Sequence, residues 1–281
     1  MSRAGGAPAS TGRGRRVAAM VCTGMGLAAM IVAPRARSES PSSPVAARPT
    51  ATATAALLAS VGEQPAARAR APEEPGWVEG PAGKAFVYPP RSQDDGAQPV
   101  TVILHGMCGH PQSACAPFVD VATTRGWLVC PRGEDECGGG TRWRLNGPDD
   151  ARLVEESVHA VASRHDGRVD DVRPRVLVGF SLGGTAAVQI AQASVGRYAG
   201  LVVIASQVHP DAAALRKAGV KRVVLAAGDL DMTSAPLRTD ARALEAQGLP
   251  TRFVSLGPYG HGYPPDMEQR MREPMQWAGG S

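Results

Sequence analysis

The chain has 281 residues, of which 43% are hydrophobic and 20% are charged, and its formal net charge is +4. This composition is typical of a water-soluble globular protein and excludes a polytopic membrane protein, a collagen-like chain and a coiled coil. Residues 1–75 contain nine Arg and four Glu, whereas residues 76–281 contain 21 basic and 22 acidic residues. Residues 76–281 are therefore nearly neutral, and the excess positive charge lies in residues 1–75. A nearly neutral domain offers no extended positive electrostatic potential to a polyanion, so we expect no nucleic-acid partner.

The first 36 residues have the pattern of an export signal. Three arginines between positions 13 and 16 precede the apolar run 17–33. A basic start followed by such a run is typical of a signal peptide, with a short membrane anchor as the alternative, so membrane contact is expected only through this segment. Residues 37–76 are rich in Ala, Pro, Ser and Thr and predict a disordered linker. The folded domain is expected over residues 77–281.

Four cysteines follow the signal segment, and their number favours two disulfides. They are Cys108, Cys115, Cys130 and Cys137. An even number of cysteines in an exported chain indicates disulfide pairs, and four cysteines allow three pairings. The spacing of seven residues within each half does not fit the short pairs of a zinc site. Free buried thiols are the alternative.

From residue 84 onward, apolar strand-like runs alternate with helical patterns. The run 84–88 predicts an edge strand, and six further runs predict buried strands: 99–104, 127–130, 175–180, 201–205, 222–226 and 252–256. The helical patterns cover residues 115–125, 149–164, 182–195, 211–218 and 236–247. Strands that are apolar on both faces and separated by helices indicate an α/β fold with a mostly parallel, doubly wound sheet of seven to eight strands.

Ser181 has the sequence context of a catalytic nucleophile. It stands in the run Gly-Phe-Ser-Leu-Gly-Gly at 179–184, after a predicted strand and at the start of a predicted helix. A sharp strand-to-helix turn leaves no room for Cβ atoms two residues on either side of the nucleophile, which explains the glycines at 179 and 183. The helix that starts here offers free N–H groups and a partial positive charge.

The expected partners of Ser181 follow in the order acid and then histidine. Asp231 comes after the strand 222–226, and His261 lies between two glycines after the strand 252–256. Loops at the carboxyl ends of parallel strands are where such a sheet presents its catalytic groups. Asp229 competes for the role of the acid. We assign that role to Asp231, three residues after Gly228, and expect Asp229 to order the turn.

An oxyanion hole needs two N–H donors, and the sequence offers two candidates. One is the backbone of Leu182, and the other is Met107, on the loop after the strand 99–104. Gly106 would let that backbone pass close to the substrate. His105 is expected to order the loop. No third ligand at useful spacing supports a metal site at His105 and His110, so we expect no metal and no cofactor.

At these residues the chain resembles the α/β-hydrolase superfamily. The strand-to-helix turn around Ser181, called the elbow below, is similar to the Gly-Phe-Ser-Gln-Gly-Gly turn of the carboxylesterase, acyl-thioesterase and dienelactone-hydrolase branch. The run 140–143 with Trp143 and the acidic helix start at 149–150 also resemble that branch. Leu182 replaces the usual Gln, so the thioesterase preference is not carried over. Only 16 residues separate the strands 201–205 and 222–226, which leaves no room for a large lid domain.

These patterns together predict an exported serine hydrolase that cleaves carboxylic esters through Ser181, His261 and Asp231 by way of an acyl-enzyme. Its substrate would be a small-molecule or polymer-linked ester, and Gly106, His105 and Trp143 are candidates for the loops that contact it. A serine peptidase of the same fold and a non-catalytic binding protein are the alternatives. The sequence does not specify the oligomeric state.

Overall fold

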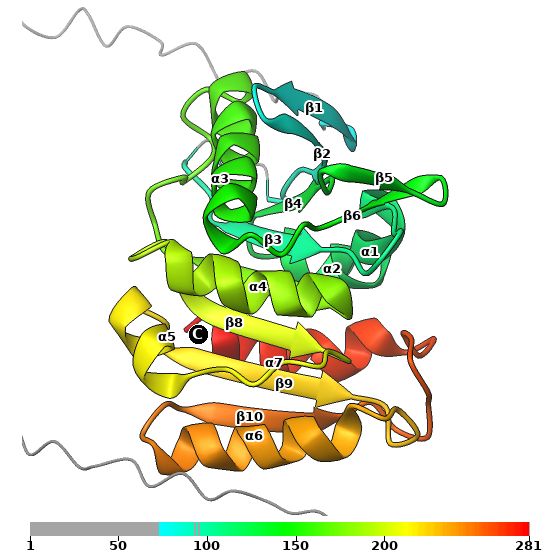
Figure 1. The fold of residues 1–281 in the computed structure, drawn as a ribbon. Helices are drawn as coiled ribbons and strands as arrows, with labels where there is room; N and C mark the ends of the chain where they lie inside the picture. Colours follow the sequence, from blue (N-terminus) through cyan, green and yellow to red (C-terminus); the bar gives the residue numbers. More distant parts are fainter. Residues whose placement is uncertain (1–72, 93, 95, 281) are drawn as a thin grey trace, which may run out of the picture. The chain divides into compact units, whose positions relative to one another are not determined.

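The computed structural model describes residues 73–92, 94 and 96–280. The proposed signal segment and most of the proposed linker lie outside these residues. The described part contains an eight-stranded sheet in the order β1-β2-β4-β3-β7-β8-β9-β10, with helices on both of its faces (Figure 1). A separate two-stranded hairpin consists of β5 (Asp135–Cys137) and β6 (Gly140–Arg142).

Each of the seven predicted strands forms, and an eighth precedes them. The strands of the large sheet are β1 (Gly76–Gly80), β2 (Gly83–Tyr88), β3 (Val100–Leu104), β4 (Trp127–Pro131), β7 (Arg175–Phe180), β8 (Tyr198–Ile204), β9 (Arg222–Ala227) and β10 (Thr251–Ser255). β3, β4 and β7 to β10 run parallel to one another, whereas β2 pairs antiparallel with both of its neighbours, β1 and β4. The prediction of β2 as the edge strand was wrong, because β1 pairs with its outer side.

The helices follow the predicted pattern except at two places. They are α1 (Pro111–Cys115), α2 (Val119–Thr123), α3 (Gly147–Arg164), α4 (Leu182–Ala193), α5 (Ala212–Ala218), α6 (Ser234–Ala246) and α7 (Met267–Ala278). The single helix predicted at 115–125 is replaced by α1, a 3₁₀ turn (Ala116–Phe118) and α2. Pro117 lies in that turn, and a proline cannot donate the backbone hydrogen bond that a continuous helix requires. α7 was not predicted.

The core consists of two layers, one on each face of the sheet. On β3, Val102 and Leu104 pack on the face covered by α3, α4, α5 and α6, whereas Ile103 packs on the face covered by α2 and α7. All three side chains are at most 1% exposed. Successive side chains of a strand point to opposite faces, so a strand covered on both faces must be apolar throughout. This constraint explains the continuous apolar runs in the sequence.

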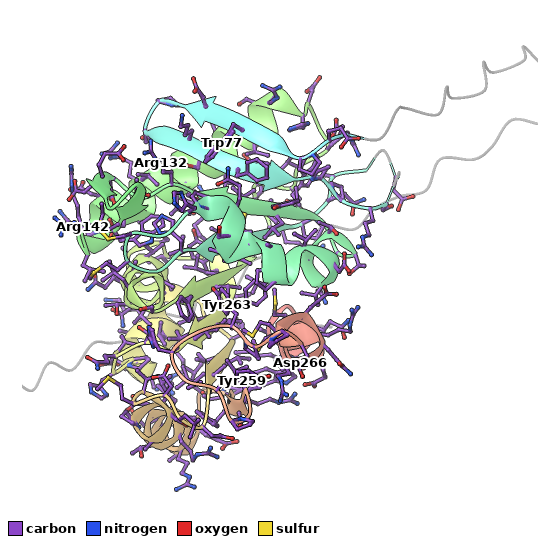
Figure 2. All side chains as sticks on the ribbon, turned by 90° about the vertical axis from the view of Figure 1, so that its right-hand side faces the viewer. Trp77, Arg132, Arg142, Tyr259, Tyr263 and Asp266 are labelled. Atoms are coloured by element: carbon purple, nitrogen blue, oxygen red, sulfur yellow. A yellow bond between two sulfur atoms is a disulfide. The ribbon has the colours of Figure 1, made fainter. Side chains whose placement is uncertain are left out.

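The parallel arrangement brings the carboxyl ends of the strands to one edge of the sheet. Figure 2 looks onto this edge, where Tyr259 and Tyr263 lie on the loop between β10 and α7. The chain between β8 and β9 forms only α5, so the described residues contain no large lid domain over this edge. The loops after β3, β7, β9 and β10 therefore meet in one open region.

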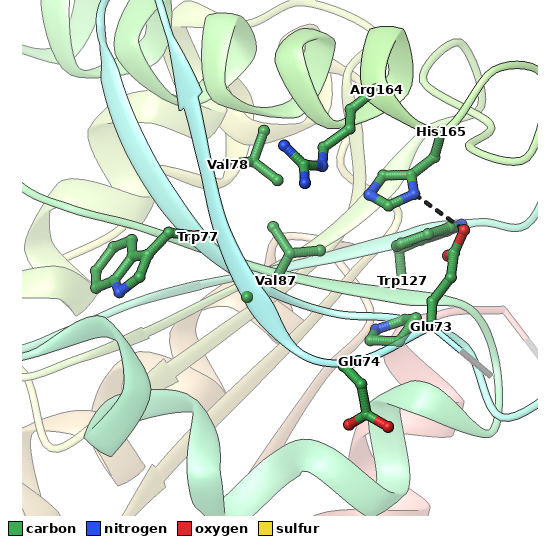
Figure 3. A pocket seen from close by; sticks show the side chains of 10 residues that line it. Glu73, Glu74, Trp77, Val78, Val87, Trp127, Arg164 and His165 are labelled. Carbon is green, nitrogen blue, oxygen red and sulfur yellow. Dashed lines mark hydrogen bonds and ion pairs between the residues drawn. The ribbon is translucent and has the colours of Figure 1, made fainter. Parts of the chain in front are cut away.

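A cavity of about 340 Å³ lies at the opposite end of the strands (Figure 3). The His165 ring packs 4.4 Å from the Trp127 ring, measured between centroids. The carboxylate of Glu73 lies 3.3 Å from Nδ1 of His165 and 2.9 Å from the guanidinium of Arg168. These contacts attach the start of the described chain to the region that follows α3.

Two buried carboxyl groups meet between the loop after β4 and the first turn of α3. Asp150 is fully buried, and neither its carboxyl oxygens nor those of Glu134 accept a hydrogen bond from any described residue. Burial, and next the adjacent Glu134 carboxyl, raise the pKa of Asp150 to about 8. We expect the two groups to share a proton at neutral pH, because a proton between them supplies the missing hydrogen bond.

This pair should make stability depend on pH. The unfolded chain loses the Asp150 proton near the ordinary pKa of 3.8, whereas the folded protein keeps it until about pH 8, so the free energy of unfolding should fall as pH rises between these values. Asp150→Asn should flatten this slope and stabilise the protein at pH 8 relative to the wild type. Urea unfolding at pH 4, 6 and 8 measures this, with the exposed Asp149→Asn as the matched control. Equal slopes in wild type and Asp150→Asn would contradict the shared proton.

Candidate active site

Ser181 occupies a sharp turn between β7 and α4. Its backbone angles are φ 54° and ψ −122°, a region that L-residues rarely adopt. A Cβ at position 179 would collide with the carbonyl of Gly183, and a Cβ at position 183 would collide with the carbonyls of Leu104 and His105. Only glycine at both positions allows this turn.

Ser181, His261 and Asp231 form a continuous hydrogen-bonded chain. Nε2 of His261 lies 2.9 Å from Oγ of Ser181, and Nδ1 lies 2.8 Å from Oδ2 of Asp231. The Asp231 side chain is fully buried, whereas that of His261 is half exposed. The imidazole thus links the serine at the mouth of the cleft to a carboxylate beneath it.

Hydrogen bonds keep the Asp231 carboxylate ionised. Burial alone would raise its pKa, but Oδ1 accepts hydrogen bonds from the Thr233 N–H (2.8 Å) and hydroxyl (2.9 Å), and Oδ2 accepts one from His261. Together these bonds outweigh the burial, so the pKa of Asp231 lies below its ordinary value. The group beside the imidazole therefore carries a negative charge.

Asp229, the competing candidate for the acid, has different partners. Its Oδ1 accepts a hydrogen bond from the Ser255 hydroxyl at 2.6 Å and lies 3.9 Å from the Arg238 guanidinium. Its backbone N–H donates to the carbonyl of Gly257. Asp229 therefore connects the turn after β9 to the end of β10, which is the ordering role predicted from the sequence.

An aromatic cluster holds the loop of His261 against the elbow. The Phe180 ring lies 5.2 Å from the His261 ring and 4.6 Å from the Tyr263 ring. Tyr263 also makes an edge contact with Phe118 at 5.5 Å. The residue just before Ser181 thus packs against His261 and the loop that carries it.

The two predicted oxyanion donors flank Ser181. Leu182 is the first residue of α4, where backbone N–H groups have no partner within the helix. Met107 lines the same cleft as Ser181. Gly106 packs on the elbow, because a Cβ at this position would lie 3.3 Å from Cβ of Ser181. This close approach places the backbone before Met107 beside the serine.

Two of the predicted substrate-loop residues do not reach the cleft. His105 is 1% exposed and Trp143 is 2% exposed, and their rings pack 5.1 Å apart beneath the loop. The Trp143 indole N–H donates to the carbonyl oxygen of His105 at 2.9 Å. Both residues support the loop from below and are not placed to touch a substrate.

The cleft around Ser181 has a volume of about 700 Å³ and a largely apolar lining. Met107, Leu230 and Met232 project at its rim with exposures of 62%, 73% and 77%. The remaining lining residues are Leu145, Ser181, Leu182, Thr185, Ala205, Gln207, Asp231, Thr233 and His261. Among them Asp231 is the only residue of the Asp, Glu, Lys and Arg types. Leu230 and Met232 were not predicted from the sequence as lining residues. Their place on either side of Asp231 in the sequence is the feature from which they could have been predicted.

Unusual backbone conformations concentrate at this site. The described non-glycine residues with positive φ are Cys108, Leu145, Ser181 and Ala205. Three of them line the cleft, and Cys108 adjoins Met107. Such conformations cost about 1–3 kcal/mol each and persist where the surroundings over-determine them, typically at functional sites.

Two disulfides join the loop after β3 and the helix α1 to neighbouring segments. Cys108 pairs with Cys137, and Cys115 pairs with Cys130. The first is partly exposed and joins the loop after β3 to the β5–β6 hairpin, whereas the second is buried and joins α1 to β4. The structure thus selects one of the three pairings that the sequence left open. Closed loops of this size are stabilised by roughly 3 kcal/mol per bond.

The comparisons with known proteins identify the fold. No family model and no curated protein matches the chain. Among solved structures, esterase PE8 has a TM-score of 0.54 at 19% identity, covering 72% of this chain and 99% of its own. The Staphylococcus aureus fluorophosphonate-binding serine hydrolase FphF gives 0.55 at 13%, covering 73% and 97%, and a ferulic acid esterase gives 0.55 at 16%, covering 73% and 96%. The chain has the α/β-hydrolase fold, as predicted.

Proposed function

We propose that this protein is a serine hydrolase that cleaves carboxylic esters. The observation that carries the proposal is the chain of contacts from Ser181 Oγ through the His261 ring to the Asp231 carboxylate, at 2.9 and 2.8 Å. Distances in this range are those required of a nucleophile, its base and the group that orients the base. The esterases and serine hydrolases among the similar structures support the same reaction class.

In this mechanism Ser181 Oγ attacks the acyl carbonyl while His261 Nε2 takes its proton. Asp231 holds the Nδ1–H and stabilises the imidazolium that forms. The negative charge on the former carbonyl oxygen is met by the N–H groups of Leu182 and Met107. His261 then returns the proton to the departing alcohol. Water next attacks the acyl carbon while His261 takes its proton, the bond from that carbon to Ser181 Oγ breaks, and His261 returns the proton to Oγ as the acid leaves.

The lining of the cleft favours an uncharged, apolar substrate. Met107, Leu230 and Met232 offer exposed apolar surface at the rim, and the single carboxylate in the lining is bonded to the imidazole. An anionic or cationic group on the substrate would find no opposite free charge in this lining. The open rim would admit an ester attached to a larger or polymeric molecule as readily as a small one.

Short p-nitrophenyl esters should be hydrolysed, and peptide anilides should not. Ser181→Ala should abolish the activity and the labelling by a fluorophosphonate probe, because both need the hydroxyl as nucleophile. Ser194→Ala, the same change at the far end of α4, should retain both. Cleavage of anilides in preference to esters would identify a peptidase. If folded wild-type protein neither hydrolyses esters nor reacts with the probe, the alternative of a non-catalytic binding protein would hold.

The two aspartates of the turn after β9 should differ strongly in their effect on rate. Asp231→Asn should lower kcat/KM on the order of 10⁴-fold, because the imidazole loses the carboxylate that fixes its tautomer. Asp229→Asn, a matched change two residues away, should cost far less because Asp229 bonds to Ser255 and not to His261. Steady-state kinetics on one ester compare the two, and the reverse ranking would reject Asp231 as the acid.

We also propose that the protein works outside the cytoplasm. The basic and apolar start of the chain supports export, and the two disulfides are typical of oxidising compartments. No helix among the described residues is long and apolar enough to cross a membrane. Fractionation of the host should place the protein outside the inner membrane, with a mass four hydrogens below that of the reduced chain. Cytosolic, fully reduced protein would contradict export.

A further inference from the structure

His105 directly follows β3 and has a hydrogen-bonding partner at each ring nitrogen, although it is almost fully buried. Its Nδ1 lies 2.7 Å from the carbonyl oxygen of Gly106. Its Nε2 lies 3.1 Å from the backbone N–H of Gly133 and 3.1 Å from the hydroxyl of Thr141. Both polar atoms of this buried ring are satisfied, and the partners on its two sides restrain the direction in which the ring points.

These partners determine the tautomer. A backbone N–H such as that of Gly133 can only donate, so Nε2 must present its lone pair. A carbonyl oxygen such as that of Gly106 can only accept, so Nδ1 must carry the proton. Burial, the largest influence, lowers the pKa of His105 and favours this neutral ring. The imidazole therefore receives hydrogen bonds on one side and donates one on the other.

The carbonyl that accepts from His105 belongs to the same peptide unit as the Met107 N–H. A trans peptide is planar, and its C=O and N–H point in opposite directions. Gly106 O also accepts from the N–H of Gly109 at 3.1 Å. Because the oxygen end is held by two donors, the direction of the Met107 N–H is fixed, and Gly106 packs that peptide against Ser181.

We propose that His105 is a positioning residue that orients the Gly106–Met107 peptide and so aims one N–H of the oxyanion hole. The β5–β6 hairpin and the residues that flank it hold His105 in place by hydrogen bonds from Gly133, Thr141 and the indole of Trp143. The hairpin is joined to the oxyanion loop independently by the Cys108–Cys137 disulfide and by the Thr141 N–H, which donates to the Gly109 carbonyl at 3.1 Å. This inference rests on the proposed function, because an aimed donor matters only if Ser181 attacks a carbonyl.

The kinetic test uses two substitutions at position 105 with ester substrates. His105→Leu removes the polar contacts at both ring nitrogens at similar volume and should lower kcat on the order of 10- to 100-fold with little change in KM, because the donor acts on the transition state. His105→Asn keeps an N–H near the Nδ1 position and should recover part of the loss. A purely structural role would lower the melting temperature but leave kcat per folded molecule unchanged, which would overturn the proposal.

A second pair of variants covers the case in which position 105 tolerates no change. Thr141→Val removes the hydroxyl that contacts Nε2 and should lower kcat several-fold at unchanged KM. Thr123→Val is the matched control, since Thr123 is also buried but bonds within α2, to the carbonyl of Val119. Equal kcat values for these two variants would count against the proposal.

The tautomer can be read without any substrate. Long-range ¹H–¹⁵N NMR correlations on the full chain should show a His105 ring protonated on Nδ1 and bare on Nε2, and this signal should vanish in His105→Asn. A proton on Nε2 would overturn the proposal. Failure of the proposed function is separate: wild type would then neither hydrolyse esters nor react with the fluorophosphonate. If wild type and folded His105→Leu hydrolyse esters at equal rates, the positioning role of His105 is rejected while the proposed function stands.

Discussion

The geometry of the site depends on the close contact between the start of α4 and the end of β3. The backbone of Gly183 lies against the carbonyl groups of Leu104 and His105, at a separation that no Cβ would permit. This contact sets how far the elbow with Ser181 and Leu182 lies from the loop with Gly106 and Met107. Because β3 and β7 are neighbours in one parallel sheet, the contact is imposed by strand pairing and does not need a flexible segment to close.

The strained backbone of the site is held by the same strand ends. Ser181 N–H donates to the carbonyl of Ile204 at 2.9 Å, and Ala205 N–H donates to the carbonyl of Ala226 at 2.8 Å. These two positive-φ residues are thus tied to the last residues of the adjacent strand, inside a core that is apolar on both faces. The cost of each unusual conformation is small beside the burial of the strands that impose it. The sheet therefore determines where Ser181 lies.

The parts of the fold that could be predicted are those with a repeated physical signal. Doubly buried strands must be apolar, so the strands from β3 to β10 of the large sheet were found, as were the elbow and its downstream partners. α7 was missed because its buried face is carried by Met267, Met271 and Met275 among charged residues, with Pro274 inside the helix. The hairpin was missed because glycines at 138 to 140 carry no periodicity. Trp143 and His105 looked accessible by position, but burial depends on contacts from distant segments.

The two halves of the candidate site therefore derive their rigidity from different sources. Ser181 and Leu182 are fixed by the parallel sheet, which is a property of the fold. The Gly106–Met107 peptide follows the last hydrogen-bonded residue of β3 and needs another support, which the hairpin provides through a disulfide, a backbone bridge and a buried imidazole. A hydrogen bond is directional, so the imidazole would restrain the direction of the peptide, whereas the disulfide links Cys108, the residue after Met107, to the hairpin. Both are required, because an oxyanion donor must be near the serine and must also point at the oxygen.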